Sequence, residues 1–259
     1  MSTSQRIGFG KKIRIEWLIE AIKLRAHGSD FDQARVGLES LFAPTNPGKA
    51  AISKILSSIR QVVFQPDVRN IEHTMAGIGF ALENPEHALC IAWGLSLTSY
   101  SFVATTAETV GRLLKLQPHF TGAELCRRLA ERLGEREFVN RAARYNLSSF
   151  LDWGVVSCEK KRLYSRAKSL NVEDTAIWAW LIEAVLFASG QGTMPFSQAA
   201  SSPLLFPFSF APVSAPLIIQ NNPRLQLLRQ SLNEEFISLI DPSATKISLK
   251  RRMRFNVTS

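Results

Sequence analysis

Apolar residues recur every three to four positions along the N-terminal half of this chain, which is the spacing of an amphipathic helix. The pattern predicts helices over residues 11–26, 30–42, 49–64, 68–83 and 86–100. Turn signals separate them: His27-Gly28, the PTNPG stretch at 44–48, Pro66 and Asn84-Pro85. We therefore expect a helical bundle over residues 1–104.

The next stretch changes from helical to mixed patterning. Residues 105–116 are amphipathic, and Thr121 with Glu124 forms a capping-box signature for a helix that ends at Gly134. A second helix is predicted over about 135–151, followed by two short strands, VVSC and RLYS, around the charged EKK tip. Helix, tight turn, helix and basic β-hairpin is the order of a winged helix-turn-helix, which we assign to residues 105–170.

Residues 171–259 give a less regular pattern. A long apolar helix is predicted over 173–189, and no charged residue occurs from Ala184 to Pro223, where prolines divide the chain into extended pieces. Short strands are expected at 217–219 and 225–228, and a short helix at 231–240, before a basic tail. The sequence gives no internal repeat. The expected fold class is mainly α: a helical bundle, a winged helix-turn-helix with a small β-hairpin, and an irregular C-terminal segment with short strands.

The charge of the chain points to an anionic partner. The formal net charge is +9, and residues 112–168 alone carry 13 Lys and Arg against six Asp and Glu. A helix fits the major groove of duplex DNA while cations contact the phosphates. The candidate DNA-binding residues are Arg136, Asn140, Arg141 and Arg144 on the second helix, Lys160, Lys161 and Arg162 at the hairpin tip, and Lys49 and Lys54 in the bundle. A solvated basic face is the alternative for the bundle lysines.

No set of residues indicates catalysis. The chain lacks GxSxG, Walker A, GxGxxG and HExxH motifs, so we expect a protein that is not an enzyme. Cys90, Cys126 and Cys158 are widely spaced and the four histidines form no ligand pair, so neither a metal nor a cofactor is expected. The cysteine usage and the absence of a signal peptide favour a cytoplasmic location, and the uncharged stretch 88–107 is too polar for a membrane span.

Three stretches carry a resemblance to a known family. IRIEWLIEAIKL followed by NPGKAAISKILSSIRQVV, then HALCIAWGLSLTSYSFVATTAETV, then LSSFLDWGVVS, are similar in order and character to the BrxA family of BREX phage-defence systems. The resemblance covers about residues 11–170. It implies a NusB-like helical fold, binding to duplex DNA, and neighbours such as a methyltransferase, an ATPase and a phosphatase-like subunit. The proline-rich stretch after Gly190 and the basic tail depart from the family.

The leading hypothesis is therefore a non-enzymatic, duplex-DNA-binding component of a phage-defence system. One alternative is a protein–protein adaptor that uses the uncharged run 184–223, because exposed apolar patches often mark interfaces. A second is RNA binding by the helical bundle, which a NusB-like resemblance would allow. A membrane-anchored subunit is the least favoured reading.

Overall fold

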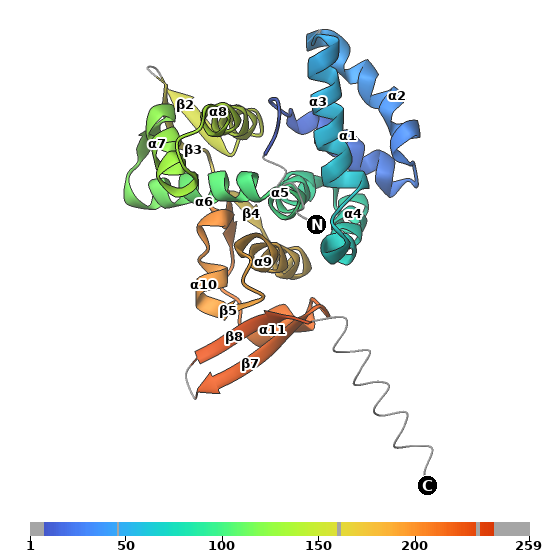
Figure 1. Cartoon of the computed structure of the whole chain (residues 1–259). Helices are drawn as coiled ribbons and strands as arrows, with labels where there is room; N and C mark the ends of the chain where they lie inside the picture. Colours follow the sequence, from blue (N-terminus) through green and yellow to red (C-terminus); the bar gives the residue numbers. More distant parts are fainter. Residues whose placement is uncertain (1–7, 46, 160–161, 232–233, 241–259) are drawn as a thin grey trace, which may run out of the picture.

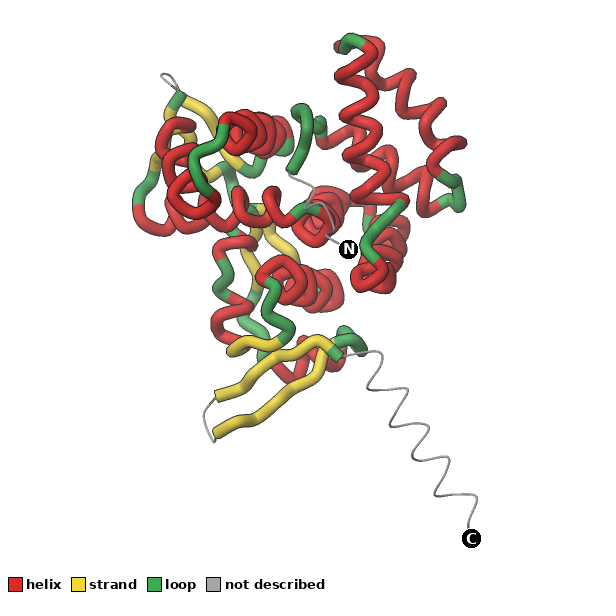
Figure 2. Tube along the Cα trace, in the orientation of Figure 1, coloured by secondary structure: helices red, strands yellow, loops and turns green. Residues whose placement is uncertain are grey.

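The computed structural model describes residues 8–45, 47–159, 162–231 and 234–240. Within these ranges the chain is mainly helical, and small sheets of two or three strands occur only C-terminal to residue 118 (Figures 1 and 2). The mainly α prediction is confirmed. The predicted hairpin tip residues Lys160 and Lys161 lie outside the described residues.

The N-terminal helices follow the apolar pattern closely. They are α1 (Ile15–Ala26), α2 (Phe31–Phe42), α3 (Lys49–Ile59) with a π-helical turn at Arg60–Phe64, α4 (Ile71–Glu83) and α5 (Ala88–Ser99). In α1, Leu18 and Ile22 are fully buried, as their spacing of four predicts. The segment 8–14 precedes α1 and lies between α3 and α8 (Figure 1).

Helix α5 explains the uncharged stretch 88–107. It packs against α1, α4, α9 and the following helix α6 (Ser101–Leu116), so it has no solvent-facing side that would require charge. Among the described residues, no single helix is long and apolar enough to cross a membrane. The pair Pro85–Ser99 and Ser101–Leu116 meets that test only together, and the two helices are bent by 117°.

Residues 101–166, which we name the first unit, combine helices with a three-stranded sheet. After α6 come β1 (His119–Thr121), α7 (Gly122–Leu133), α8 (Glu137–Asp152), β2 (Val156–Glu159) and β3 (Leu163–Arg166). All pairings are antiparallel, and the strand order is β1-β3-β2. The first strand thus closes the sheet against the second strand of the hairpin.

Residues 175–239, the second unit, repeat this order of elements, with a 3-10 turn at Pro203–Leu205 and the strand β6 (Phe208–Phe210) inserted between the two shorter helices. They comprise α9 (Thr175–Ser189), β5 (Thr193–Pro195), α10 (Phe196–Ala200), α11 (Ala215–Gln220), β7 (Leu225–Ser231) and β8 (Glu234–Leu239). The sheet order β5-β8-β7 is again antiparallel and again pairs the first strand with the second strand of the hairpin. A separate parallel pair joins β4 (Leu170–Val172) to β6 (Phe208–Phe210). The chain therefore contains a topological repeat that the sequence did not reveal.

Two predicted elements of the second unit are wrong. Residues 217–219 belong to α11 and are not a strand: Ala215 and Ile218 are buried three positions apart, which is helical spacing. Residues 234–239 form β8 and are not a helix, because β8 is the central strand and hydrogen-bonds to β5 and β7 on its two edges. In both places tertiary packing overrides the local preference of the residues.

The packing site of the Trp180 side chain determines how closely α9 approaches the N-terminal helical bundle. Its indole ring lies against Gly77 of α4 and Gly94 of α5, where an added Cβ would overlap the ring. The indole Nε1 also donates a hydrogen bond of 2.9 Å to the backbone oxygen of His73. A side chain at either glycine would push α9 away from α4 and α5.

We expect Gly94→Ala to lower the free energy of unfolding by about 1–3 kcal/mol, because the new methyl group overpacks the Trp180 site. The matched control is Gly79→Ala in α4, where a Cβ would meet nothing within 4 Å. That variant should gain up to about 1 kcal/mol from helix propensity. Urea unfolding measures both, and equal effects of the two substitutions would contradict the packing assignment.

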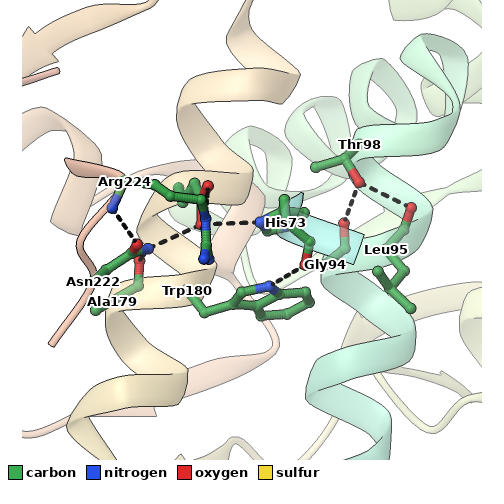
Figure 3. Close-up of polar contacts among 9 residues, drawn as sticks. His73, Gly94, Leu95, Thr98, Ala179, Trp180, Asn222 and Arg224 are labelled. Atoms are coloured by element: carbon green, nitrogen blue, oxygen red, sulfur yellow. Dashed lines mark hydrogen bonds and ion pairs between the residues drawn. The ribbon is translucent and has the colours of Figure 1, made fainter. Parts of the chain in front are cut away.

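A buried polar cluster connects α4, α9 and the loop before β7 (Figure 3). Glu183 of α9 is almost fully buried and accepts hydrogen bonds from Arg224 Nε at 2.7 Å and Arg224 Nη2 at 2.8 Å. Asn222 Nδ2 donates to the same carboxylate at 2.9 Å. His73 Nδ1 lies 3.2 Å from Glu183 Oε2, and the His73 ring stacks on Trp180 with centroids 4.4 Å apart.

The electrostatics of the cluster favour an ionised Glu183 beside a neutral His73. Burial by itself would raise the pKa of Glu183, but the neighbouring His73 imidazole and the hydrogen bonds and positive charge of Arg224 outweigh burial and lower that pKa to about 2. Burial lowers the pKa of His73, which disfavours its charged form. Arg224 is therefore the principal counter-ion of Glu183.

The depressed pKa of Glu183 gives stability that is present above the unfolded carboxyl pKa of about 4.3 and lost as the pH falls toward 2. Glu183→Gln should lower the unfolding free energy by about 3–5 kcal/mol at pH 7, since Arg224 loses its partner. The difference in unfolding free energy between the variant and the wild type should decrease as the pH falls from 4.5 to 2.5. Chemical denaturation across that range measures it, with the exposed Glu137→Gln as control. A gap that stays constant with pH would refute the assignment.

Candidate nucleic-acid interface

The local sequence fixes the start and end of α7. Thr121 is its N-cap, and its Oγ1 accepts a hydrogen bond of 3.1 Å from the backbone N–H of Glu124, as predicted. The reciprocal half of the capping box is not formed, because the Glu124 carboxylate accepts from Gln117 Nε2 instead. Gly134 ends the helix with φ +85°, a conformation that favours glycine.

Helix α8 is held by its inner face. Asn146 Nδ2 donates to Thr106 Oγ1 at 3.0 Å, and both side chains are fully buried. Ser149 Oγ accepts from the backbone N–H of Ile13 at 2.8 Å, while Trp153 Nε1 donates to the Ile13 oxygen at 2.9 Å. These contacts fix α8 against both α6 and the segment that leads into α1, and leave its outer face to solvent.

The predicted helix residues lie on that outer face. Arg141 and Arg144 are exposed, and Asn140 is half-exposed one turn before Arg144. Arg136 is the exposed N-cap residue, with its guanidinium 5.9 Å from the centre of the Phe138 ring. Arg141 lies 3.6 Å from the exposed carboxylate of Glu137, a pair that solvent screens strongly.

On one side of α8 lies an open groove of about 1350 Å³, which we name the α7–α8 groove. Its cationic lining comes from α7, α8 and the hairpin: Arg127, Arg136, Arg144 and Arg162. Asn140 and Tyr164 also line it, as do three carboxylates, Glu131, Glu135 and Glu137. Arg162 has φ +59°, so the hairpin turns tightly just before β3. The groove thus brings together four of the predicted residues.

On the other side of α8 lies a second depression, between α8, segment 8–14 and α3, which we name the α3–α8 cleft. Two adjoining cavities of about 580 and 330 Å³ form it, and Tyr145 lines both. The predicted residues Arg141 and Lys54 face this cleft. Lys49 is exposed in the first turn of α3 but lines neither depression. The predicted residues therefore divide between two surfaces.

Sequence reasoning missed two residues of the cleft, Lys11 and Tyr145. The Lys11 ammonium lies 5.3 Å from the centre of the Tyr145 ring. Tyr145 is half-buried on α8. The pairing could not be read from the sequence because 134 positions separate the two residues.

The exposed apolar surface is not where the sequence placed it. Much of the uncharged run 184–223 is buried, including Leu186, Met194, Leu204, Leu205, Phe206 and Ile218. Instead, α4 and the turn before it expose large apolar side chains at Val68, Ile71, Met75 and Leu82. The reason given for an adaptor that docks through residues 184–223 is thereby removed for most of that run.

Comparisons with protein-family models, with curated proteins and with solved structures each found no match. The geometry and chemistry of the chain's own residues therefore carry the functional argument.

The three cysteines should differ sharply in reactivity, because the thiolate is the reacting form. Cys158 is exposed, whereas burial raises the pKa of Cys126 in the α7–α8 groove and raises that of Cys90 to about 12. We expect iodoacetamide at pH 8 to label Cys158 first, Cys126 more slowly, and Cys90 only after unfolding. Mass spectrometry of tryptic peptides gives the order, and labelling of Cys90 in the native protein would contradict the structure.

Proposed function

We propose that the protein binds duplex DNA through a winged helix-turn-helix made of α6, α7, α8 and the strands β1, β2 and β3. One observation carries the proposal: α8 exposes Asn140 and Arg144 beside a hairpin that brings Arg162 to the same groove. The sheet order β1-β3-β2, in which the hairpin strand β3 pairs with the strand before α7, supports the proposal.

The chemistry of the groove suits a duplex. An α-helix fits the major groove, where arginine pairs with guanine and asparagine with adenine. Arg144 and Asn140, one turn apart, would read base edges, while Arg127, Arg136 and Arg162 would contact phosphates on either side. The N-terminal turn of α7, at Gly122 and Ala123, also lines the groove and offers backbone N–H groups to a phosphate.

The biological setting that we propose is a bacterial phage-defence system of the BREX type, in which the protein is a non-enzymatic DNA-binding component. This part rests on the sequence resemblance of residues 11–170 to the BrxA family. Partner subunits such as a methyltransferase, an ATPase and a phosphatase-like protein belong to the same proposal. Co-purification of the tagged protein from its native host tests it, and the absence of all three would count against it.

Replacing Arg144 by Ala should weaken binding to a 20-base-pair duplex by roughly tenfold or more, because a base-edge or phosphate contact is worth about 1–3 kcal/mol. The matched control is Arg35→Ala in α2, which removes an exposed arginine paired with Glu39 on a distant helix. That control should stay within about twofold of wild type. Fluorescence anisotropy at one fixed salt concentration measures both.

A second variant, in the hairpin, tests the same proposal in the same binding assay. Neutralising Lys160, Lys161 and Arg162 together should weaken binding to all sequences and reduce the salt slope of log K by up to about 2.7, at roughly 0.9 per phosphate contact. An unchanged affinity in both the Arg144 and the hairpin variants would reject the duplex proposal.

A further inference from the structure

We propose that the α3–α8 cleft is a separate binding site for single-stranded nucleic acid. The site is distinct from the α7–α8 groove, since the exposed outer ridge of α8 lies between them. Its lining comes from α3, α8 and the connecting segment 8–14, which Figure 1 shows between these two helices.

The first observation is an excess of uncompensated positive charge. Lys11, Lys54 and Arg141 line the cleft, and of these Arg141 has an acidic neighbour, the exposed carboxylate of Glu137 at 3.6 Å. Two neighbouring cations are paired with two carboxylates, because Lys12 contacts Asp152 while Arg14 contacts Glu16 and Asp152. Within the part of the chain that the structure describes, Lys11 and Lys54 have no acidic partner, so their charge is available to an anion.

The second observation is that the cations have defined positions. The stem of Lys54 lies against the backbone of Gly10, where an added Cβ would be 3.6 Å from the Lys54 Cβ. The Lys11 ammonium lies over the Tyr145 ring, a cation–π contact. The Lys11 ammonium and the side-chain stem of Lys54 are therefore positioned at the cleft.

The third observation is that aromatic rings and hydroxyl groups line the cleft together with these cations. Phe138 and Tyr145 are half-buried on the α8 wall, and the exposed Ser53 and Ser57 lie on the α3 wall. Unpaired bases stack on aromatic side chains, while a cationic groove follows the phosphate backbone. In a duplex the base faces are stacked on one another inside the helix and cannot stack on these rings, so the lining favours a single strand.

The length of the cleft determines how many nucleotides of a single-stranded nucleic acid it can hold. The C-terminal half of α3 faces the N-terminal half of α8, while Pro47 and Ala51 near the start of α3 line the cavity that reaches Asp152. From Phe138 to Asp152 the cleft is about 21 Å long, at 1.5 Å per helical residue. At roughly 3.4 Å per stacked nucleotide, it holds about six nucleotides.

The experiment measures fluorescence anisotropy of labelled oligothymidylates of 3, 6, 9 and 12 nucleotides with the full chain. We expect affinity to rise up to about six nucleotides, apart from the statistical gain of longer strands. Lys11→Ala combined with Lys54→Ala should weaken binding of the 12-mer by roughly tenfold and reduce its salt slope by about 1.4, at about 0.7 per contact. A 12-mer of uridine distinguishes an RNA preference from a DNA preference.

Three controls make the outcome decisive. Lys23→Ala with Arg35→Ala removes two exposed cations of α1 and α2 that do not line the cleft, and should change affinity less than twofold. Arg144→Ala should weaken the duplex and spare the single strand, whereas the Lys11 and Lys54 variant should do the reverse. Lysine-to-arginine substitutions at both positions should keep most of the binding and show that loss of fold is not the cause.

The proposal is overturned if the Lys11 and Lys54 variant binds the 12-mer as wild type does, or if the control pair weakens it equally. It is also overturned if tripolyphosphate at equal phosphate concentration displaces the strand fully, since that would show a site for anions alone. Failure of duplex binding would leave this result intact, because each site has its own variant and its own probe.

Discussion

The close approach of α9 to the bundle is the constraint on which the rest of the structure depends. Two glycines, Gly77 and Gly94, leave room for the Trp180 indole between α4 and α5. Because the Trp180 ring packs at this position, Glu183, one turn later on α9, is buried in the interior. A buried carboxylate must be paired, and Arg224 and Asn222 pair it from the loop before β7. One packing contact thus fixes the position of the loop that leads into β7.

A comparable constraint acts on α8 from the opposite end of the chain. The backbone of Ile13 is bonded to Ser149 and Trp153, so the segment before α1 is fixed along the side of α8. This contact places α3 across from α8 and divides the exposed cations into two sets. Arg144 faces the hairpin, whereas Arg141 faces Lys54. A basic helix that would be one surface in isolation has two chemically different sides in the folded chain.

The sequence sufficed to predict those helices whose position depends on residues close together in the chain. Helix periodicity, the Thr121 cap and the Gly134 stop sufficed to place α7 and α8, because those signals depend on neighbours within a few residues. The α3–α8 cleft could not be predicted from the sequence, because Lys11, Lys54 and Tyr145 are brought together only by tertiary packing. Residues 234–239 were assigned to a helix because their two glutamates suit a first helical turn. Their strand conformation is dictated by β5 and β7 on either side, and periodicity over six residues cannot foresee that.

The repeated topology was invisible for a related reason, and its chemistry is informative. The two units share element order and sheet order, yet α8 presents Arg141 and Arg144, whereas α11 reads APLIIQ and carries no charge. The helix α9 is also buried along most of its length, whereas the equivalent α6 alternates buried and exposed positions. Equivalent positions therefore face a different environment in each unit, and sequence similarity has no reason to persist. The same order of elements therefore presents a charged, solvent-exposed helix in the first unit, whereas in the second unit α11 is uncharged and contributes Ala215 and Ile218 to the core.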